Sequence, residues 1–229
     1  MEKPIKCDEE LLMFLKNIQA SHIDYLVDVL TDNGGTRIAL PAAIKDLLHS
    51  EKEDKKYTEK SLRHLLHEFQ NYGGHSIGNI CRNILNKEPP SYAEILTDVH
   101  KKLNGTDSKN KPTQQKEREI VFGLFGNEWE TLPDHTRWER CTELQVLSGF
   151  FNMNKNLNFD EKGAVIGFSS VASAAVLIAR GVKSIKAFSI PGAIGLAAQS
   201  MGEAYRITIP FTAHIAMLKM IYTSKPSHQ

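Results

Sequence analysis

Apolar residues in the first hundred positions recur at the spacing of amphipathic helices. The clearest stripe follows the i, i+3, i+4, i+7 rule and consists of Leu62, Leu65, Leu66 and Phe69. Shorter stripes predict three earlier helices, which start at Asp8, Ser21 and Pro41. No segment alternates apolar and polar residues with the period of a β-strand. The pattern therefore predicts an all-α protein built as a multi-helix bundle.

Glycines and capping residues give the expected helix ends. Gly73 and Gly74 are predicted to end the helix that carries the leucine stripe. Ser76 would then cap a further helix that runs to about residue 85. The sequence "SYAE" at 91–94 is a capping box, which predicts the start of another helix.

The chain is expected to fall into three parts. Residues 1–104 form an N-terminal helical module with charges of both signs. Residues 105–117 contain no apolar side chain and are interpreted as a polar linker. Residues 118–229 form a C-terminal helical region that contains an apolar helical hairpin at 163–202.

Two uncharged runs define this predicted hairpin. They are 17 and 16 residues long, at 163–179 and 187–202. A basic turn joins them and carries Arg180, Lys183 and Lys186. Glycines suited to close contact between helices, or with a partner, lie at Gly163, Gly167, Gly192 and Gly195. Because a helix without a polar face must be hidden, the hairpin is expected to lie inside protein or against lipid.

The sequence leaves three fates open for the hairpin. It can be the buried core of a soluble fold, it can contact an anionic membrane, or it can span a bilayer. A helix of 17 residues is about 26 Å long, which is short of the ~30 Å hydrocarbon core. Spanning would also carry the basic turn across the membrane, against the positive-inside tendency, so it is the least favoured. At an anionic surface each turn cation would gain ~1 kcal/mol.

The residues after the hairpin give one more pattern. The sequence "AYRITIP" predicts a short extended piece that ends at Pro210. An amphipathic helix is expected to follow it.

Composition and charge narrow the classes of function. The net charge of +1, with 41% hydrophobic and 24% charged residues, is ordinary for a globular protein and gives no general field for nucleic acid. The charges are unevenly spread, because residues 163–222 contain five Lys or Arg and one acid, Glu203. Three dispersed cysteines and a charged N-terminal stretch predict a cytoplasmic protein, peripheral at most at the inner face of the cytoplasmic membrane.

A possible nucleophile motif occurs once. Gly74-His75-Ser76-Ile77-Gly78 matches the G-x-S-x-G elbow of serine hydrolases. That elbow needs a buried strand before the serine, whereas the preceding residues have helical periodicity. We therefore interpret Ser76 as a helix cap, and a hydrolase with Ser76 as its nucleophile remains a minor alternative.

A second candidate for chemistry is "RHLLHE", which places His64, His67 and Glu68 within about one helical turn. The order of these residues matches neither zincin motif. All three point away from the leucine stripe, so a solvated face is the favoured interpretation. The sequence therefore predicts no metal site, no cofactor and no catalytic constellation.

Four segments resemble the YaaW family of uncharacterised bacterial proteins. They are "DYLVDVLTDNGGTR" at 24–37, "YGGHSIGNICRN" at 72–83, "YAEILTDVHKKL" at 92–103 and "GEAYRITIP" at 202–210. The family usually has Asn and Thr where this chain has His75 and Ser76, so a hydroxyl is kept at the cap position. The middle region of the family is distantly similar to the ubiquinol–cytochrome c chaperones.

The resemblance implies an all-helical protein and supplies no reaction. Within its second block, Asn79 and Arg82 match the family pattern, and we interpret them as a buried joint or a partner-binding pair. Within its last block the matching residues are Tyr205, Arg206 and Pro210.

These patterns together predict a non-enzymatic helical protein. We expect it to bind a protein partner and to contact an anionic membrane surface, with no nucleic acid and no small-molecule substrate. An assembly factor or chaperone agrees with the family resemblance. A conditional membrane-permeabilising effector agrees with the hairpin alone. The partner and the oligomeric state are left open.

Overall fold

The fold is helical, as predicted. The computed structural model describes residues 5–31, 40–76, 89–104, 108–125, 127–139, 158–159, 165–166 and 203–223. The α-helices in chain order are α1 (Glu9–Lys16), α2 (Ala20–Thr31), α3 (Ala42–Glu53), α4 (Glu59–Ser76), α6 (Tyr92–Asn104), α7 (Thr113–Phe125) and α11 (Glu203–Thr223). A 3₁₀ helix, η1 (Asn127–Thr131), follows α7.

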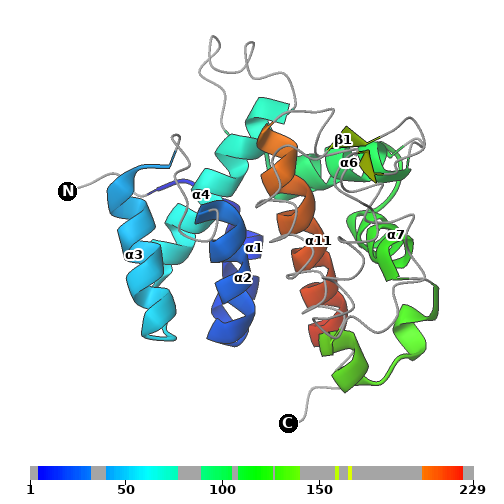
Figure 1. The fold of residues 1–229 in the computed structure, drawn as a ribbon, viewed down its shortest axis with the longest axis horizontal. Helices are drawn as coiled ribbons and strands as arrows, with labels where there is room; N and C mark the ends of the chain where they lie inside the picture. Colours follow the sequence, from blue (N-terminus) through cyan, green and yellow to red (C-terminus); the bar gives the residue numbers. More distant parts are fainter. Residues whose placement is uncertain are drawn as a thin grey trace.

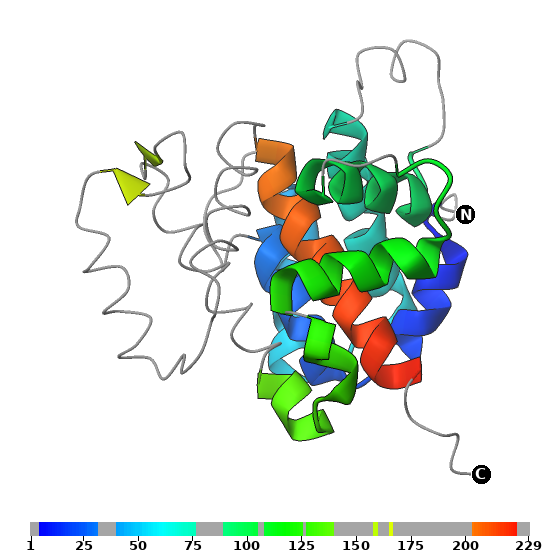
Figure 2. The ribbon, with the colours of Figure 1, turned by 90° about the vertical axis from the view of Figure 1, so that its right-hand side faces the viewer.

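The last of these helices lies at the centre. Figure 1 shows α11 between α1, α2 and α3 on one side and α6 and α7 on the other. In the turned view α7 crosses α11 (Figure 2). Every residue from Ile207 to Leu218 is buried, so this stretch of the helix has no solvated face. A helix of that kind must be enclosed by other elements, and the chain before residue 126 provides four of them: α2, α4, α6 and α7.

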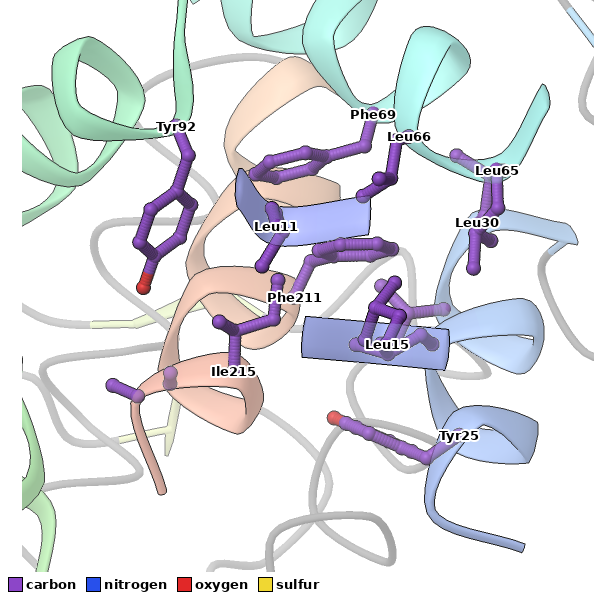
Figure 3. Packing of buried hydrophobic residues seen from close by; sticks show 14 of the residues in the cluster. Leu11, Leu15, Tyr25, Leu30, Leu65, Leu66, Phe69, Tyr92, Phe211 and Ile215 are labelled. Carbon is purple, nitrogen blue, oxygen red and sulfur yellow. The ribbon is translucent and has the colours of Figure 1, made fainter. Parts of the chain in front are cut away.

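The predicted leucine stripe faces this centre. Leu62, Leu65, Leu66 and Phe69 on α4 are all buried. The ring of Phe69 stacks on the ring of Phe211 from α11, with centroids 4.1 Å apart (Figure 3). Stacked aromatic pairs of this kind add to the stability that burial alone gives. The stripe is therefore part of the hydrophobic core, in which Phe69 contacts α11.

The structure corrects the expectation for residues 204–210. This segment was predicted to be extended up to Pro210, but it belongs to α11, with Pro210 inside the helix and buried. A proline in a helix interior removes one backbone hydrogen bond. Burial on all sides outweighs that loss. For the same reason the last helix is not amphipathic.

The predicted helix end at Gly73-Gly74 is also wrong. The helix α4 continues through both glycines to Ser76. The physical reason lies across the interface, because a Cβ at Gly73 would sit 2.4 Å from Cδ1 of Ile95 on α6. Gly73 is therefore the point of closest approach between α4 and α6, and not a helix stop.

Two predicted caps are confirmed. Oδ1 of Asp8 accepts the backbone N–H of Leu11 at 3.1 Å and so caps α1. Its other oxygen, Oδ2, accepts the N–H of Tyr92 at 3.0 Å, at the start of α6. In the capping box, the N–H of Ser91 donates to Glu94 at 2.8 Å and the N–H of Glu94 donates to Ser91 Oγ at 3.3 Å. One carboxylate, that of Asp8, thus links the first turns of α1 and α6.

The predicted three parts do not have separate cores among the described residues. One hydrophobic cluster contains side chains from α1, α2 and α4 together with α7 and α11. Residues 113–117 of the predicted linker form the first turn of α7. The apolar hairpin at 163–202 lies outside the described residues, except for one short strand.

That strand differs from the prediction. The two-residue strands β1 (Asn158–Phe159) and β2 (Val165–Ile166) pair antiparallel, although a helix was expected at Val165 and Ile166. Both residues are β-branched, which favours a strand over a helix.

Gly73→Ala is expected to destabilise the protein. The added methyl group would overlap the side chain of Ile95, and overpacking of this kind costs about 1–3 kcal/mol. Gly123→Ala is the matched control, because Gly123 lies exposed in α7 and alanine there should stabilise by up to about 1 kcal/mol. Urea unfolding of both variants measures the difference, and equal stability would contradict the close contact.

Candidate functional site

The polar side chains that hold α11 form the candidate site. From Ile207 to Leu218 this helix carries no charged residue. Its interior polar groups are two threonines and His214, and Lys219 and Tyr222 follow near its end. His214, Lys219 and Tyr222 each have a defined partner on another helix.

Lys219 is paired in the interior. Its Nζ lies 3.1 Å from Oε1 of Glu117 on α7, and the two side chains are only 17% and 6% exposed. The hydroxyl of Tyr92 on α6 donates to the same Oε1 at 3.0 Å. The ammonium group also lies 4.6 Å from the centre of the Tyr92 ring, within reach of a cation–π contact. Burial, followed by the charge of Glu117, raises the pKa of Tyr92, so its hydroxyl keeps the proton that it donates.

His214 is held on the opposite side by α2. Its Nε2 lies 3.0 Å from the backbone carbonyl oxygen of His22, to which it donates. The edge of the ring packs against Tyr25, with centroids 4.5 Å apart. Burial lowers the pKa of His214 to about 4, so the imidazole is neutral at pH 7. Its Nδ1 is buried and has no hydrogen-bond partner among the described residues.

The ring of His22 belongs to an aromatic cluster at the end of α11. It stacks on Trp138 with centroids 3.9 Å apart, and its Nδ1 lies 2.8 Å from the hydroxyl of Tyr222. That hydroxyl accepts the backbone N–H of Gln19 at 3.1 Å. Phe14 on α1 meets Tyr222 edge to face. The end of α11 is therefore fastened to α1, α2 and the helical residues 134–139.

A second polar group joins α6 to the segment before α7. His100 is fully buried, with Nδ1 2.6 Å from Ser108 Oγ and Nε2 2.6 Å from Glu119 Oε2. Glu119 is also held by Lys111 and Gln115. The hydrogen bond from Lys111 is the largest cause that lowers the pKa of Glu119, to about 2.

This group has the residue types of a Ser–His–Glu triad, but the serine and the acid are exchanged between the two ring nitrogens and the exposure is also reversed. Ser108 is 2% exposed, whereas the acid is the most open member at 29%. A nucleophile has to reach its substrate, and in a serine hydrolase triad the acid is the buried member. We therefore interpret the group as a structural contact that fixes the connection from α6 to α7.

The structure brings few of the predicted site residues together. Gly73 and Gly74 lie inside α4, and Ser76 is its last residue. A helix, and not a strand, leads into Ser76, so the nucleophile elbow is absent. Asn79 and Arg82 lie outside the described residues, as do Gly163, Gly167, Arg180, Lys183, Lys186, Gly192 and Gly195. Tyr205 and Arg206 lie in the first turns of α11, ahead of the buried Pro210.

The histidines of α4 are not gathered around a common point. Nδ1 of His67 lies 3.0 Å from the backbone oxygen of Lys6. Glu68 is half-buried, and that burial raises its pKa. Within the part of the chain that the structure describes, no three His, Cys, Asp or Glu side chains are placed to bind one metal ion.

Sequence reasoning missed the residues that hold α11. Lys219 and Glu117 are far apart in the chain and belong to no motif. One signal was available, because Lys219 is the only charge in an otherwise apolar final helix after Arg206. A single charge in such a helix indicates a buried partner.

Among the described helices, none combines the length and the hydropathy that crossing a bilayer would take.

Breaking the buried ion pair is expected to destabilise strongly. Lys219→Met removes the cation that pairs with the buried Glu117, and breaking a buried ion pair from one side costs about 3 kcal/mol or more. Arg118→Met is the control, because Arg118 and Glu130 form an ion pair in which both side chains are about half exposed. That change should cost less than about 1 kcal/mol. Equal losses in chemical unfolding would show that Glu117 is solvated.

Glu119 should contribute to stability only above acidic pH. Its pKa falls from 4.5 to about 2 on folding, so its contribution is complete above pH 4.5 and is lost as the pH falls toward 2. Glu119→Gln should therefore be less stable than the wild type at pH 7, with a difference that narrows below pH 4.5. Glu128→Gln, an exposed control, should lie within about 0.5 kcal/mol of the wild type at pH 7. A difference that is constant from pH 7 to pH 3 would contradict this assignment.

Two relatives match nearly the whole chain. The UPF0174 protein YaaW of Escherichia coli strain K12 is 25% identical over 231 aligned positions, which cover 93% of this chain and 94% of the relative. The protein of the same name from Escherichia coli O157:H7 is 24% identical with the same coverage. No family model matches, and no solved structure matches. The similarity to the ubiquinol–cytochrome c chaperones stays a prediction, whereas the predicted resemblance of this chain to the YaaW family is confirmed.

Proposed function

We propose that this protein is non-enzymatic, that it contacts an anionic membrane surface, and that it assists the assembly of a protein partner there. The observation that carries the proposal is the position of the apolar hairpin in the chain. Its uncharged runs lead directly into α11, which is buried throughout its middle. The protein would work at the cytoplasmic face of the membrane.

The surrounding helices support this assignment. The hydrophobic cluster unites residues that precede and follow the hairpin in sequence. They come from α1 to α4, α6, α7 and α11. Both flanks of the segment are thus attached to one bundle. Because the bundle holds the chain on both sides of the apolar segment, no separate domain is needed to attach that segment.

The charges of the turn favour an anionic partner. Arg180, Lys183 and Lys186 lie within seven residues that contain no acid. Near an anionic surface each cation contributes about 1 kcal/mol. Three cations together would strengthen binding by roughly a hundredfold or more.

The name of the relatives states no activity, so the choice between an assembly factor and a membrane-permeabilising effector rests on experiment. An effector would release dye from vesicles to which it binds. An assembly factor would bind the same vesicles and leave them sealed. We favour the assembly factor because α11, the continuation of the hairpin, is held by specific buried contacts.

Flotation with vesicles tests the proposal on the full chain. Removal of everything after residue 162 would also remove α11 from the core, so a truncated chain is unsuitable. The full chain should float with anionic vesicles and remain unbound with neutral ones. Changing Arg180, Lys183 and Lys186 to Glu together should weaken binding at least about a hundredfold.

The matched control changes three exposed lysines of the bundle to Glu, namely Lys56, Lys60 and Lys101. It alters the net charge equally and should retain binding. Equal weakening in both triple variants would indicate a general charge effect and no special role for the turn. If the wild type fails to float with anionic vesicles at every pH, membrane contact is excluded.

A further inference from the structure

The described contact between α2 and α11 brings two histidines together, His22 and His214. His214 donates from Nε2 to the backbone oxygen of His22, and its buried Nδ1 has no partner within the part of the chain that the structure describes. The causes of its lowered pKa are burial first and then the charge of His22, while the backbone hydrogen bond acts in the opposite direction. A proton on Nδ1 would therefore create a buried cation, beside a second histidine, with an N–H that has no acceptor.

In the described part of the chain, the side chains that the neighbouring helices bring to α11 are aromatic or already engaged with another partner. From α2, Tyr25 presents its ring to His214. From α4, the contact is the stack of Phe69 on Phe211. Glu117 on α7 and Tyr92 on α6 are engaged with Lys219.

The remaining neighbours belong to the aromatic cluster. Phe14 of α1 meets Tyr222, and Trp138 stacks on His22. Near Trp138, Asp134, His135 and Glu139 are exposed, and Arg137 is occupied by the carbonyl oxygens of Trp129 and Glu130. The position of His214 is thus built for a neutral imidazole.

The surface that α11 would expose on release has a defined character. Twelve residues without charge, 207–218, lie between Arg206 and Lys219. This helix does not meet the requirements of a membrane span. An apolar helix with a cation at each end suits the interface of an anionic bilayer, where the cations meet the headgroups.

We propose that His214 is an acid-operated latch: its protonation releases α11 from α2 and makes the apolar surface of α11 available to anionic lipid. The inference rests on the proposed function, because it names the condition under which the membrane is contacted. At neutral pH the latch is closed and α11 stays in the core. In mild acid the release becomes more favourable, and the membrane then stabilises the released helix.

The size of the effect follows from linkage. A released His214 titrates near pH 6.5 and the buried one near pH 4, so the closed state loses stability as the pH falls between those values. The equilibrium constant for opening should rise about 20-fold from pH 7 to pH 5, and on the order of a hundredfold by pH 4. Below pH 4 the effect of this residue should level off.

Hydrogen exchange followed by mass spectrometry tests the latch on the full chain without lipid. Amides of residues 207–218 should lose protection between pH 7 and pH 5 by about the 20-fold stated above, after correction for intrinsic exchange rates. His214→Gln should abolish this loss, while His135→Gln, an exposed control, should preserve it. The same loss of protection in wild type and His214→Gln would overturn the proposal.

A direct titration covers the case in which His214→Gln does not fold. Nuclear magnetic resonance of the wild type should give His214 a pKa near 4, and a value of 6.5 or above would overturn the latch. Flotation with anionic vesicles at pH 7 and pH 5 separates the two proposals. Acid-dependent opening without flotation at any pH would refute membrane contact and leave the latch intact. Flotation of equal strength at both pH values would refute the latch and leave membrane contact intact.

Discussion

The fold depends on the enclosure of one helix that has no polar face. From Ile207 to Leu218 every side chain of α11 is removed from water, so the surrounding helices must present an apolar surface on each side. That requirement explains the leucine stripe of α4 and the stack of Phe69 on Phe211. It also explains why a proline is tolerated inside α11, since the burial of a whole helix outweighs one missing hydrogen bond.

Polar contacts then fix how α11 sits among its neighbours. Apolar packing alone is tolerant of sliding and rotation, whereas a buried charge has to meet its partner. Lys219 reaches Glu117 and Tyr92 on one side, and His214 reaches the carbonyl of His22 on the other. The two contacts lie on different sides of the helix, so together they set its rotation. The contact of His214 also favours conditions in which its imidazole is neutral, because burial lowers the pKa of His214.

The sequence was informative wherever structure depends on neighbours in the chain. The spacing of Leu62, Leu65 and Leu66 and the cap at Asp8 were predicted correctly, because helical periodicity and capping are local. The predictions at Gly73 and Pro210 were wrong. Rules for helix-breaking residues consider only the local sequence, whereas packing against other helices keeps α4 and α11 helical at these two positions.

The candidate site could not be predicted for a related reason. It is made of single residues from α2, α6, α7 and α11, and no motif connects them. Only the fold brings Glu117 beside Lys219, or His22 beside His214. The predicted residues of the hairpin, from Gly163 to Gly195, lie outside the described part of the chain and stay predictions.

The central position of α11 has a consequence for synthesis on the ribosome. The helices that enclose it leave the ribosome first, while α11 is the last described element to be made. Until α11 emerges, the apolar faces of α2, α4, α6 and α7 have no central helix to pack against. At 5–20 residues per second, the roughly hundred residues between α7 and the end of α11 take on the order of 5 to 20 seconds to add. During that interval the nascent chain exposes apolar surfaces, and the hydrophobic core described here closes only when α11 has been added.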